Sequence, residues 1–172
     1  MSMLNKFYRE LLDKHGANSY RTLSWISPAT QAIRFAQLVK IIANQQDKFT
    51  LLDVGCGFAD LYSYLKETGF HNIDYSGIDL MPEFIDADKK AHPNIQLIEG
   101  DFLEIDFNQR YDYIVSSGTL NVIVDPSQPP YEHAFSVIDK MFELANCGIA
   151  FNMLWEKGKM ISRPMRASFI LT

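Results

Sequence analysis

The stretch Leu51–Leu61 constrains the fold of this chain more than any other part of the sequence. An apolar run ends at Asp53, and Gly55 and Gly57 then flank a single cysteine. Glycine permits positive φ angles and lets a ligand approach the backbone closely, which a β-carbon would prevent. Apolar side chains return at helical spacing after the turn. The stretch therefore predicts a strand, a tight ligand-binding turn and the start of a helix.

Segments with strand-like and helix-like patterns alternate along the rest of the chain. We expect strands at 72–79, 95–98, 111–116 and 148–154, and helices at 82–91 and 132–145. Short connections between alternating strands and helices are typical of a parallel sheet with helices on both faces and right-handed crossovers. The sequence therefore predicts a Rossmann-like, doubly wound α/β fold with three layers and a mostly parallel sheet.

Two helices are expected before the first strand. One covers Leu4–Lys14, and Ser27-Pro28 has the pattern of an N-cap and first helical residue that open a second helix reaching about Ala43. The residues expected on the inner face of this second helix are Ile33, Leu38, Ile41 and Ile42. These helices should pack against the sheet that follows them.

The connector between the two helices contains Tyr20, Arg21 and Trp25. We expect Tyr20 and Arg21 to fold over a bound ligand as a lid, with the guanidinium pairing with a carboxylate. The alternative is that both side chains serve packing or solvation only. Trp25 is interpreted as a packing residue that holds the helices on the sheet.

Composition limits the classes of partner. The formal net charge is −5, from 16 Lys and Arg against 21 Asp and Glu, which argues against a general affinity for nucleic acid. The only cysteines, Cys56 and Cys147, are far apart, so no disulfide framework and no metal site is expected. Cys56 is interpreted as a small packing residue in the turn and Cys147 as a core thiol beside the fifth strand. Without a signal-like or membrane-length apolar run, we expect a cytoplasmic protein with no membrane partner.

Acidic or hydroxyl side chains stand where several expected strands end. They are Asp53, Asp79, Asp101 and Ser117. In open α/β sheets ligands bind beyond the carboxyl ends of the strands. Asp79 follows Gly55 by 24 residues, a spacing that suits a carboxylate bound to two ribose hydroxyls. Asp101 and Phe102 could read the edge of an adenine ring, so together these residues indicate a nucleoside site.

Four segments in this order resemble class I S-adenosylmethionine-dependent methyltransferases of the small-molecule type. They are Leu51–Asp60, Gly77–Met81, Glu99–Phe102 and Tyr111–Gly118. The chain departs from the family pattern at Ala59, where a third glycine is usual, and alanine is a mild change there. The resemblance covers roughly the central two thirds of the chain.

The resemblance implies S-adenosyl-L-methionine as the cofactor. The glycine turn would hold the methionine part, Asp79 the ribose, Asp101 the adenine edge, and Ser117 would line the end that donates the methyl group. The full set of expected cofactor-binding residues is Asp53, Gly55, Cys56, Gly57, Asp79, Leu80, Met81, Asp101, Phe102 and Ser117, with Tyr20 and Arg21 from the connector.

The competing reading is a protein that binds a nicotinamide dinucleotide. Against it, Asp60 stands where the third glycine of the dinucleotide fingerprint belongs. A carboxylate at the helix start would repel a pyrophosphate, which needs that helix N-terminus for itself. A sulfonium cofactor carries no phosphate, so Asp60 favours the methyltransferase.

Methyl transfer from a sulfonium needs positioning more than it needs an obvious catalytic residue. His133, at the start of the expected helix 132–145, is a weak candidate for a general base. The expected acceptor is the oxygen or nitrogen of a small molecule. No residue in the sequence identifies that molecule.

The whole chain, 1–172, is interpreted as one methyltransferase domain. Residues 1–47 form N-terminal helices with a possible lid, 48–155 form the cofactor-binding core, and 156–172 form a short C-terminal remnant. Family members usually end with further strands, so we expect a truncated or divergent five-stranded form and a possible homodimer through the sheet edge. An alternative is a protein that binds the cofactor without catalysis.

Overall fold

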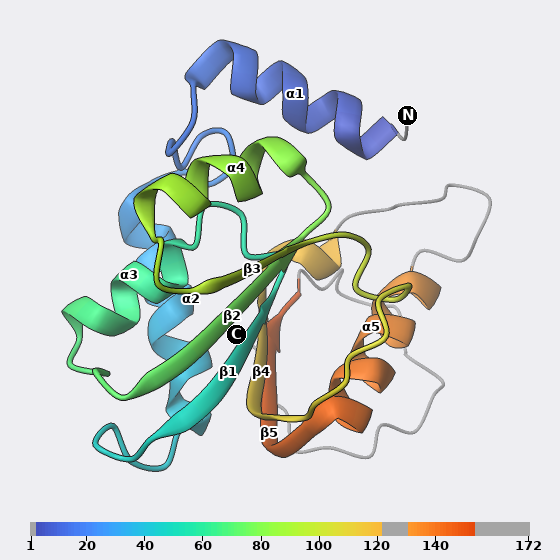
Figure 1. The fold of residues 1–172 in the computed structure, drawn as a ribbon. Coiled ribbons are helices and arrows are strands. Elements are labelled where there is room, and N and C mark those ends of the chain that lie inside the picture. The colour runs from blue at the N-terminus through green and yellow to red at the C-terminus, as the bar shows by residue number, and fades with distance from the viewer. Residues whose placement is uncertain (1–2, 122–130, 154–172) are drawn as a thin grey trace, which may run out of the picture.

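The computed structural model describes residues 3–121 and 131–153, and it contains a five-stranded sheet (Figure 1). The strands are β1 (Phe49–Val54), β2 (Ile73–Asp79), β3 (Gln96–Glu99), β4 (Tyr111–Ser117) and β5 (Ala145–Asn152). Their order in the sheet is β3-β2-β1-β4-β5, and every neighbouring pair is parallel. The order reverses between β1 and β4, which places a ligand crevice at the carboxyl ends of these two strands.

Helices cover both faces of the sheet (Figure 1). They are α1 (Met3–His15), α2 (Pro28–Leu38), α3 (Asp60–Glu67), α4 (Pro82–Ala91) and α5 (Glu132–Leu144), with short 3-10 helices at Val39–Ile41 and Thr119–Asn121. Helices α2 and α3 pack on one face and α5 on the other, while α1 lies beyond α4. The predicted three-layer, doubly wound α/β fold is confirmed.

Strand β1 separates two apolar cores because its side chains alternate between the faces of the sheet. Leu51 packs with Phe35 and Leu65 on the side of α2 and α3. Leu52 packs with Met141 on the side of α5. Both leucines of β1 are fully buried, and burial of such a side chain contributes roughly 1.5–3 kcal/mol. These two cores fix the position of the glycine turn that follows β1.

The second helix starts as predicted and ends earlier. Ser27 forms a capping box with Thr30, and Pro28 is the first helical residue, so the predicted N-cap is confirmed. The α-helix ends at Leu38 instead of about Ala43, and a 3-10 turn continues it to Ile41.

The prediction that Ile33 lies on the inner face of this helix is wrong, since 63% of Ile33 is exposed. Gln31, Phe35 and Leu38 are the buried residues of α2. They lie four and three positions apart and so share one helical face, which leaves Ile33 on the opposite side. The prediction placed the buried face wrongly because it relied on the apolar character of Ile33.

The prediction that Cys147 is a core thiol is also wrong. Cys147 is exposed in the first half of β5, which begins at Ala145 instead of Gly148. The register between β4 and β5 is irregular at this point, opposite Tyr111 and Tyr113. Burial starts only at Ala150, so the cysteine precedes the part of the strand that helices cover.

No helix within the two described ranges is both long enough and apolar enough to cross a membrane. The predicted C-terminal remnant, 156–172, and the last residue of the predicted fifth strand, Leu154, lie outside the described residues.

Candidate cofactor-binding site

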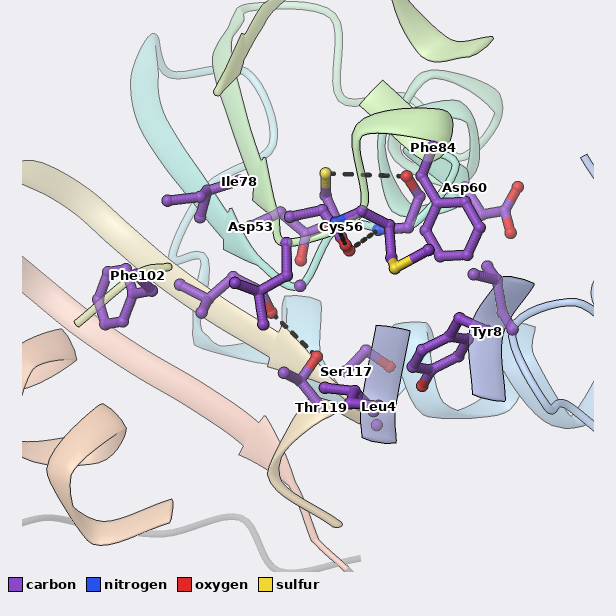
Figure 2. A pocket seen from close by; sticks show the side chains of 18 of the residues that line it. Leu4, Tyr8, Asp53, Cys56, Asp60, Ile78, Phe84, Phe102, Ser117 and Thr119 are labelled. Carbon is purple, nitrogen blue, oxygen red and sulfur yellow. Dashed lines mark hydrogen bonds between the residues drawn. The ribbon is translucent and has the colours of Figure 1, made fainter. Parts of the chain in front are cut away.

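A pocket of about 130 Å³ opens at the carboxyl ends of β1, β2 and β4 (Figure 2). The structure brings together in its wall most of the residues that the sequence pointed to. These are Asp53, Gly55, Cys56, Gly57, Asp79, Leu80, Met81, Asp101, Phe102, Ser117 and His133. Tyr20 and Arg21, the expected lid residues, are absent from the wall that the described residues form.

The glycine turn has the backbone conformation that its sequence predicts. Gly55 and Gly57 have φ angles of 74° and 59°, and Ala59 adopts the left-handed conformation at 48°. The backbone N–H groups of Gly55 and Cys56 both donate to the carbonyl of Ile78, at 2.8 and 3.1 Å. The turn is thereby tied to the end of β2, and these two donors are used inside the protein.

Asp79, at the end of β2, is a carboxylate with a fixed orientation. Its Oδ2 accepts a hydrogen bond from the N–H of Gly57 at 2.9 Å, and its Oδ1 accepts one from the N–H of Met81 at 2.9 Å. Burial raises the pKa of Asp79, and the hydrogen bonds from Met81 and Gly57 oppose that rise. A carboxylate has about four acceptor sites, so Asp79 can still accept from a ligand.

Asp53 is buried below the glycine turn. The hydroxyl of Tyr75 donates to its Oδ2 at 2.8 Å. Burial raises the pKa of Asp53 to about 7, with smaller upward contributions from Asp79 and Asp60, although the bond from Tyr75 lowers it. A cation placed in the pocket would favour the charged form of this group.

Asp60 occupies the N-terminus of α3. The side-chain amide of Gln31, from α2, donates to Asp60 Oδ2 at 2.8 Å, and both residues line the pocket. Burial raises the pKa of Asp60 and the bond from Gln31 opposes it. A carboxylate at this position already complements the positive end of the helix dipole, so it leaves no site for a phosphate.

The wall that follows β3 contains Asp101 and Phe102. Asp101 Oδ1 accepts a hydrogen bond from the N–H of Leu103 at 2.8 Å, which folds the turn onto itself. Phe102 is 6% exposed and packs on Phe107 with 5.6 Å between ring centroids.

The wall at the end of β4 depends on Asn152, a buried residue of β5. Its Nδ2 donates to Ser117 Oγ at 3.1 Å, and its Oδ1 accepts from the N–H of Gly118 at 2.8 Å. Sequence reasoning missed this residue, and also Gln31, because each acts through a partner that is far away in the chain. Asn152 is the polar residue inside the otherwise apolar predicted strand 148–154, and this is the one signal that could have found it.

The connector between α1 and α2 closes one side of the pocket with Leu23 and Trp25, and not with the expected Tyr20 and Arg21. The Leu23 side chain packs directly over Gly57, since a β-carbon added to this glycine would lie 2.9 Å from it. Trp25 lies over Gly118 in the same way, 3.4 Å from the position of an added β-carbon. Both side chains line the pocket, whereas Arg21 is exposed and donates to the Tyr20 hydroxyl at 3.1 Å. Trp25 therefore faces the pocket. The sequence analysis predicted only a packing role for this residue.

Helix α1 contributes Tyr8 to the same side (Figure 2). The Tyr8 ring packs edge-on against Phe84 of α4 with 5.8 Å between centroids, and Arg9 Nε donates to Glu83 at 2.6 Å beside it. Burial, with a smaller contribution from Asp79, raises the pKa of Tyr8 to about 12. Tyr8 is therefore a neutral hydroxyl group at physiological pH.

The described wall is acidic. Four aspartates line it, and the described lining residues include neither Lys nor Arg. His133, half-buried near the start of α5, is the only residue of the described wall whose side chain could carry a positive charge. The electrostatic field of these carboxylates favours a cationic ligand over an anionic one.

A family model described as a methyltransferase domain matches residues 51–157. The chain belongs to this methyltransferase family. The match covers the glycine turn, Asp79, Asp101 and the β4 end, so it includes the segments on which the resemblance was based. Among curated proteins, Rv1506c of Mycobacterium tuberculosis (strain ATCC 25618 / H37Rv), provisionally named a methyltransferase, is 31% identical over 115 residues. That alignment covers 66% of this chain and 68% of the relative.

Solved methyltransferase structures share the fold of the chain. The sugar N-methyltransferase KedS8 from Streptoalloteichus sp ATCC 53650 superposes with a TM-score of 0.62 at 16% identity, over 86% of this chain and 58% of that one. The amino pentose methyltransferase CalS10 from Micromonospora echinaspora, solved with S-adenosylmethionine bound, gives 0.56 at 17% identity, over 83% and 57%. The chain therefore spans less than two thirds of the length of these structures.

Proposed function

We propose that the chain binds S-adenosyl-L-methionine and transfers its methyl group to the oxygen or nitrogen of a small molecule. The observation that carries the proposal is the acidic pocket at the strand ends, with Asp79 already oriented by two backbone N–H groups. Membership of the methyltransferase family supports the same activity.

The residues of the pocket fit a sulfonium cofactor better than a dinucleotide. Burial raises the pKa of Asp53, Asp60 and Asp79, so a positively charged ligand would relieve the cost of their ionised forms. The N-terminus of α3 carries a carboxylate where a pyrophosphate would have to bind. S-adenosylmethionine has a sulfonium and an ammonium group and no phosphate.

Each part of the cofactor has candidate partners in the wall. Asp79 would accept hydrogen bonds from the ribose hydroxyls, and Asp101 would accept one from the adenine amino group. Leu80 and Met81 would pack on the adenine ring. Asp53 and Asp60 would face the positive charges of the methionine part, next to the glycine turn.

The bound cofactor would supply an electrophilic methyl group, whose carbon bonds to the acceptor lone pair while the electrons of the carbon–sulfur bond remain on sulfur. The protein would exclude water with Leu23, Trp25 and Tyr8 and hold the acceptor in line. An acceptor that enters with a proton must lose it, and His133 is the candidate base in the described wall. Positioning of this kind can supply a large part of the rate enhancement.

A small acceptor is supported by the descriptions of two related structures. KedS8 is described as a sugar N-methyltransferase and CalS10 as an amino pentose methyltransferase, and both act on small molecules.

A turnover assay tests the proposal. The full chain is incubated with S-adenosylmethionine carrying a labelled methyl group and a panel of amines and alcohols, including amino sugars. We expect the label to pass to at least one acceptor, with release of S-adenosylhomocysteine. Binding of S-adenosylhomocysteine without transfer to any acceptor would instead support a cofactor-binding protein without catalysis.

A further inference from the structure

The turn that follows β3 presents Asp101 and Phe102 to the pocket, and much of its shape comes from hydrogen bonds of Asp101. The Asp101 side chain accepts from the N–H of Leu103 at 2.8 Å. Its carbonyl accepts from the N–H groups of Glu104 and Ile105, at 3.0 and 3.1 Å. The position of the Asp101 carboxylate is therefore coupled to the position of residues 103–105.

Lys140 of α5 holds this turn from outside the pocket. Its Nζ donates to the carbonyl of Leu103 at 3.0 Å and to the carbonyl of Ile105 at 2.6 Å. The same ammonium lies 5.3 Å from the centroid of the Phe102 ring and 5.5 Å from that of Phe107. Lys140 does not line the pocket, so any effect on a ligand passes through the turn.

We propose that Lys140 is a positioning residue that sets the selectivity of the pocket for adenine. Hydrogen bonds from an ammonium to backbone carbonyls are stronger than neutral ones, and the two ring contacts add cation–π attraction. Together they fix the turn so that the Asp101 carboxylate and the Phe102 ring keep one position at the pocket. This inference rests on the proposed function, because adenine is part of S-adenosylmethionine.

Selectivity is a sharper readout than affinity. The exocyclic amino group of adenine can donate to a carboxylate, whereas hypoxanthine has a carbonyl oxygen at the same position and repels it. A site that holds Asp101 firmly should therefore discriminate between the two bases. A loosened turn would discriminate less, even where the rest of the ligand still binds.

The experiment is a calorimetric titration of the full chain with S-adenosylhomocysteine and with its hypoxanthine analogue, S-inosylhomocysteine. We expect the wild type to bind the adenine form about tenfold or more tightly, since a hydrogen bond to a charged acceptor is at stake. Lys140→Met should reduce this ratio to less than about threefold. Lys140→Arg, which keeps the charge and N–H donors, should recover part of it.

Lys66→Met is the matched control. Lys66 Nζ donates to the carbonyl of His71 at 3.2 Å, so this variant also removes an ammonium–carbonyl bond, near the amino end of β2 and away from the pocket. For Lys66→Met we expect the same ratio of affinities for the adenine and hypoxanthine ligands as for the wild type. If thermal melting shows that Lys140→Met does not fold, Lys140→Gln replaces it, and its affinity ratio is compared with that of the wild type in the same way.

The outcomes separate this inference from the proposed function. If the wild type binds neither ligand, the proposed function fails. If the wild type discriminates and Lys140→Met weakens both ligands by the same factor, Lys140 has only a structural role and the inference is overturned. A wild type that binds both ligands equally, or a Lys140→Arg ratio no better than that of Lys140→Met, also overturns it.

Discussion

At the scale of single residues, Asp79 is oriented before any ligand binds. Both of its oxygens accept backbone N–H groups, from Gly57 and Met81. The ordered carboxylate would need no rearrangement to accept the two ribose hydroxyls that we propose for it, so binding would cost little conformational entropy at this residue.

Asp79→Ala should weaken the binding of S-adenosylhomocysteine by roughly tenfold to a hundredfold, because hydrogen bonds to a charged acceptor are lost. Calorimetry measures the change. The control is Asp74→Ala, which removes an exposed carboxylate near the other end of β2 and should leave the affinity unchanged. An Asp79→Ala affinity equal to that of the wild type would refute a role for Asp79 at the ribose.

Asp88 of α4 is a buried carboxyl group that the proposed chemistry does not use. It is fully buried, and neither oxygen has a hydrogen-bond partner among the described residues. Burial, with smaller contributions from Asp60, Asp79 and Asp53, raises its pKa from 3.8 to about 8. Between these two pH values the folded protein retains a proton that the unfolded chain releases. The free energy of unfolding should therefore fall as pH rises through this window.

Asp88→Asn removes the titrating group, so the part of the pH-dependent fall in the free energy of unfolding that comes from Asp88 should disappear. The wild type should lose up to about 1.4 kcal/mol per pH unit relative to the variant between pH 4 and 8. Denaturant unfolding at several pH values measures the difference, and contributions from groups that do not interact with Asp88 cancel between the two proteins. Asp86→Asn, which changes an exposed residue of the same helix, should follow the wild type. Parallel curves for Asp88→Asn and the wild type would contradict the assignment.

The polar residues of the pocket wall could be predicted one at a time, because each stands at the end of an apolar strand or at the start of an amphipathic helix in the sequence. Their partners could not. Gln31 reaches Asp60 across 29 positions, and Asn152 reaches Ser117 across 35. Such pairs depend on how the helices and strands pack, which no local pattern contains.

At the scale of elements, the connector between α1 and α2 closes the pocket. Its contacts come from Leu23, over Gly57, and Trp25, over Gly118. Sequence reasoning placed a lid in this connector and chose Tyr20 and Arg21 for it. Ser24 adopts a left-handed backbone conformation at φ 61°, and such a turn changes which side chains point inward.

Trp25→Ala should lower the affinity for S-adenosylhomocysteine by about tenfold, because a large apolar side chain at the pocket wall is lost. Ile26→Ala is the control, since the neighbouring Ile26 is 88% exposed, and its affinity should equal that of the wild type. Calorimetry on both variants checks the expectation. Equal losses in the two variants would show that the connector acts only through stability.

The helices and strands themselves were largely predictable, because buried parallel strands and amphipathic helices leave different periodicities. The errors lie where a local pattern competes with packing. Ile33 is exposed although it is apolar, because Phe35 and Leu38 decide which face of α2 is buried. Cys147 is exposed because it lies in the first half of β5, whose burial starts only at Ala150.

At the scale of the whole molecule, the carboxylates at the strand ends make one acidic pocket from elements far apart in sequence. Burial raises the pKa of Asp53, one carboxyl group of this pocket, to about 7, so the charge of Asp53 changes near neutral pH. Its negative form should attract the sulfonium of S-adenosylmethionine, whereas S-adenosylhomocysteine has a neutral sulfur. The preference for the sulfonium form should therefore depend on pH.

The ratio of the affinities for S-adenosylmethionine and S-adenosylhomocysteine should rise severalfold from pH 6 to pH 8, as Asp53 loses its proton near pH 7. Titrations at pH 6, 7 and 8 measure it. The Asp53→Asn variant, which cannot ionise at this position, should show a smaller rise in the ratio over the same range. A ratio that falls with pH in the wild type would contradict the proposed role of Asp53.

The central claim is that the strand-end pocket is a sulfonium-nucleoside site and not a dinucleotide site. Its most direct test is calorimetry of the full chain with S-adenosylhomocysteine and, in parallel, with NAD. We expect one molecule of S-adenosylhomocysteine to bind per chain and NAD to show no binding at the same concentrations. Binding of NAD without binding of S-adenosylhomocysteine, or binding of neither, would contradict the claim.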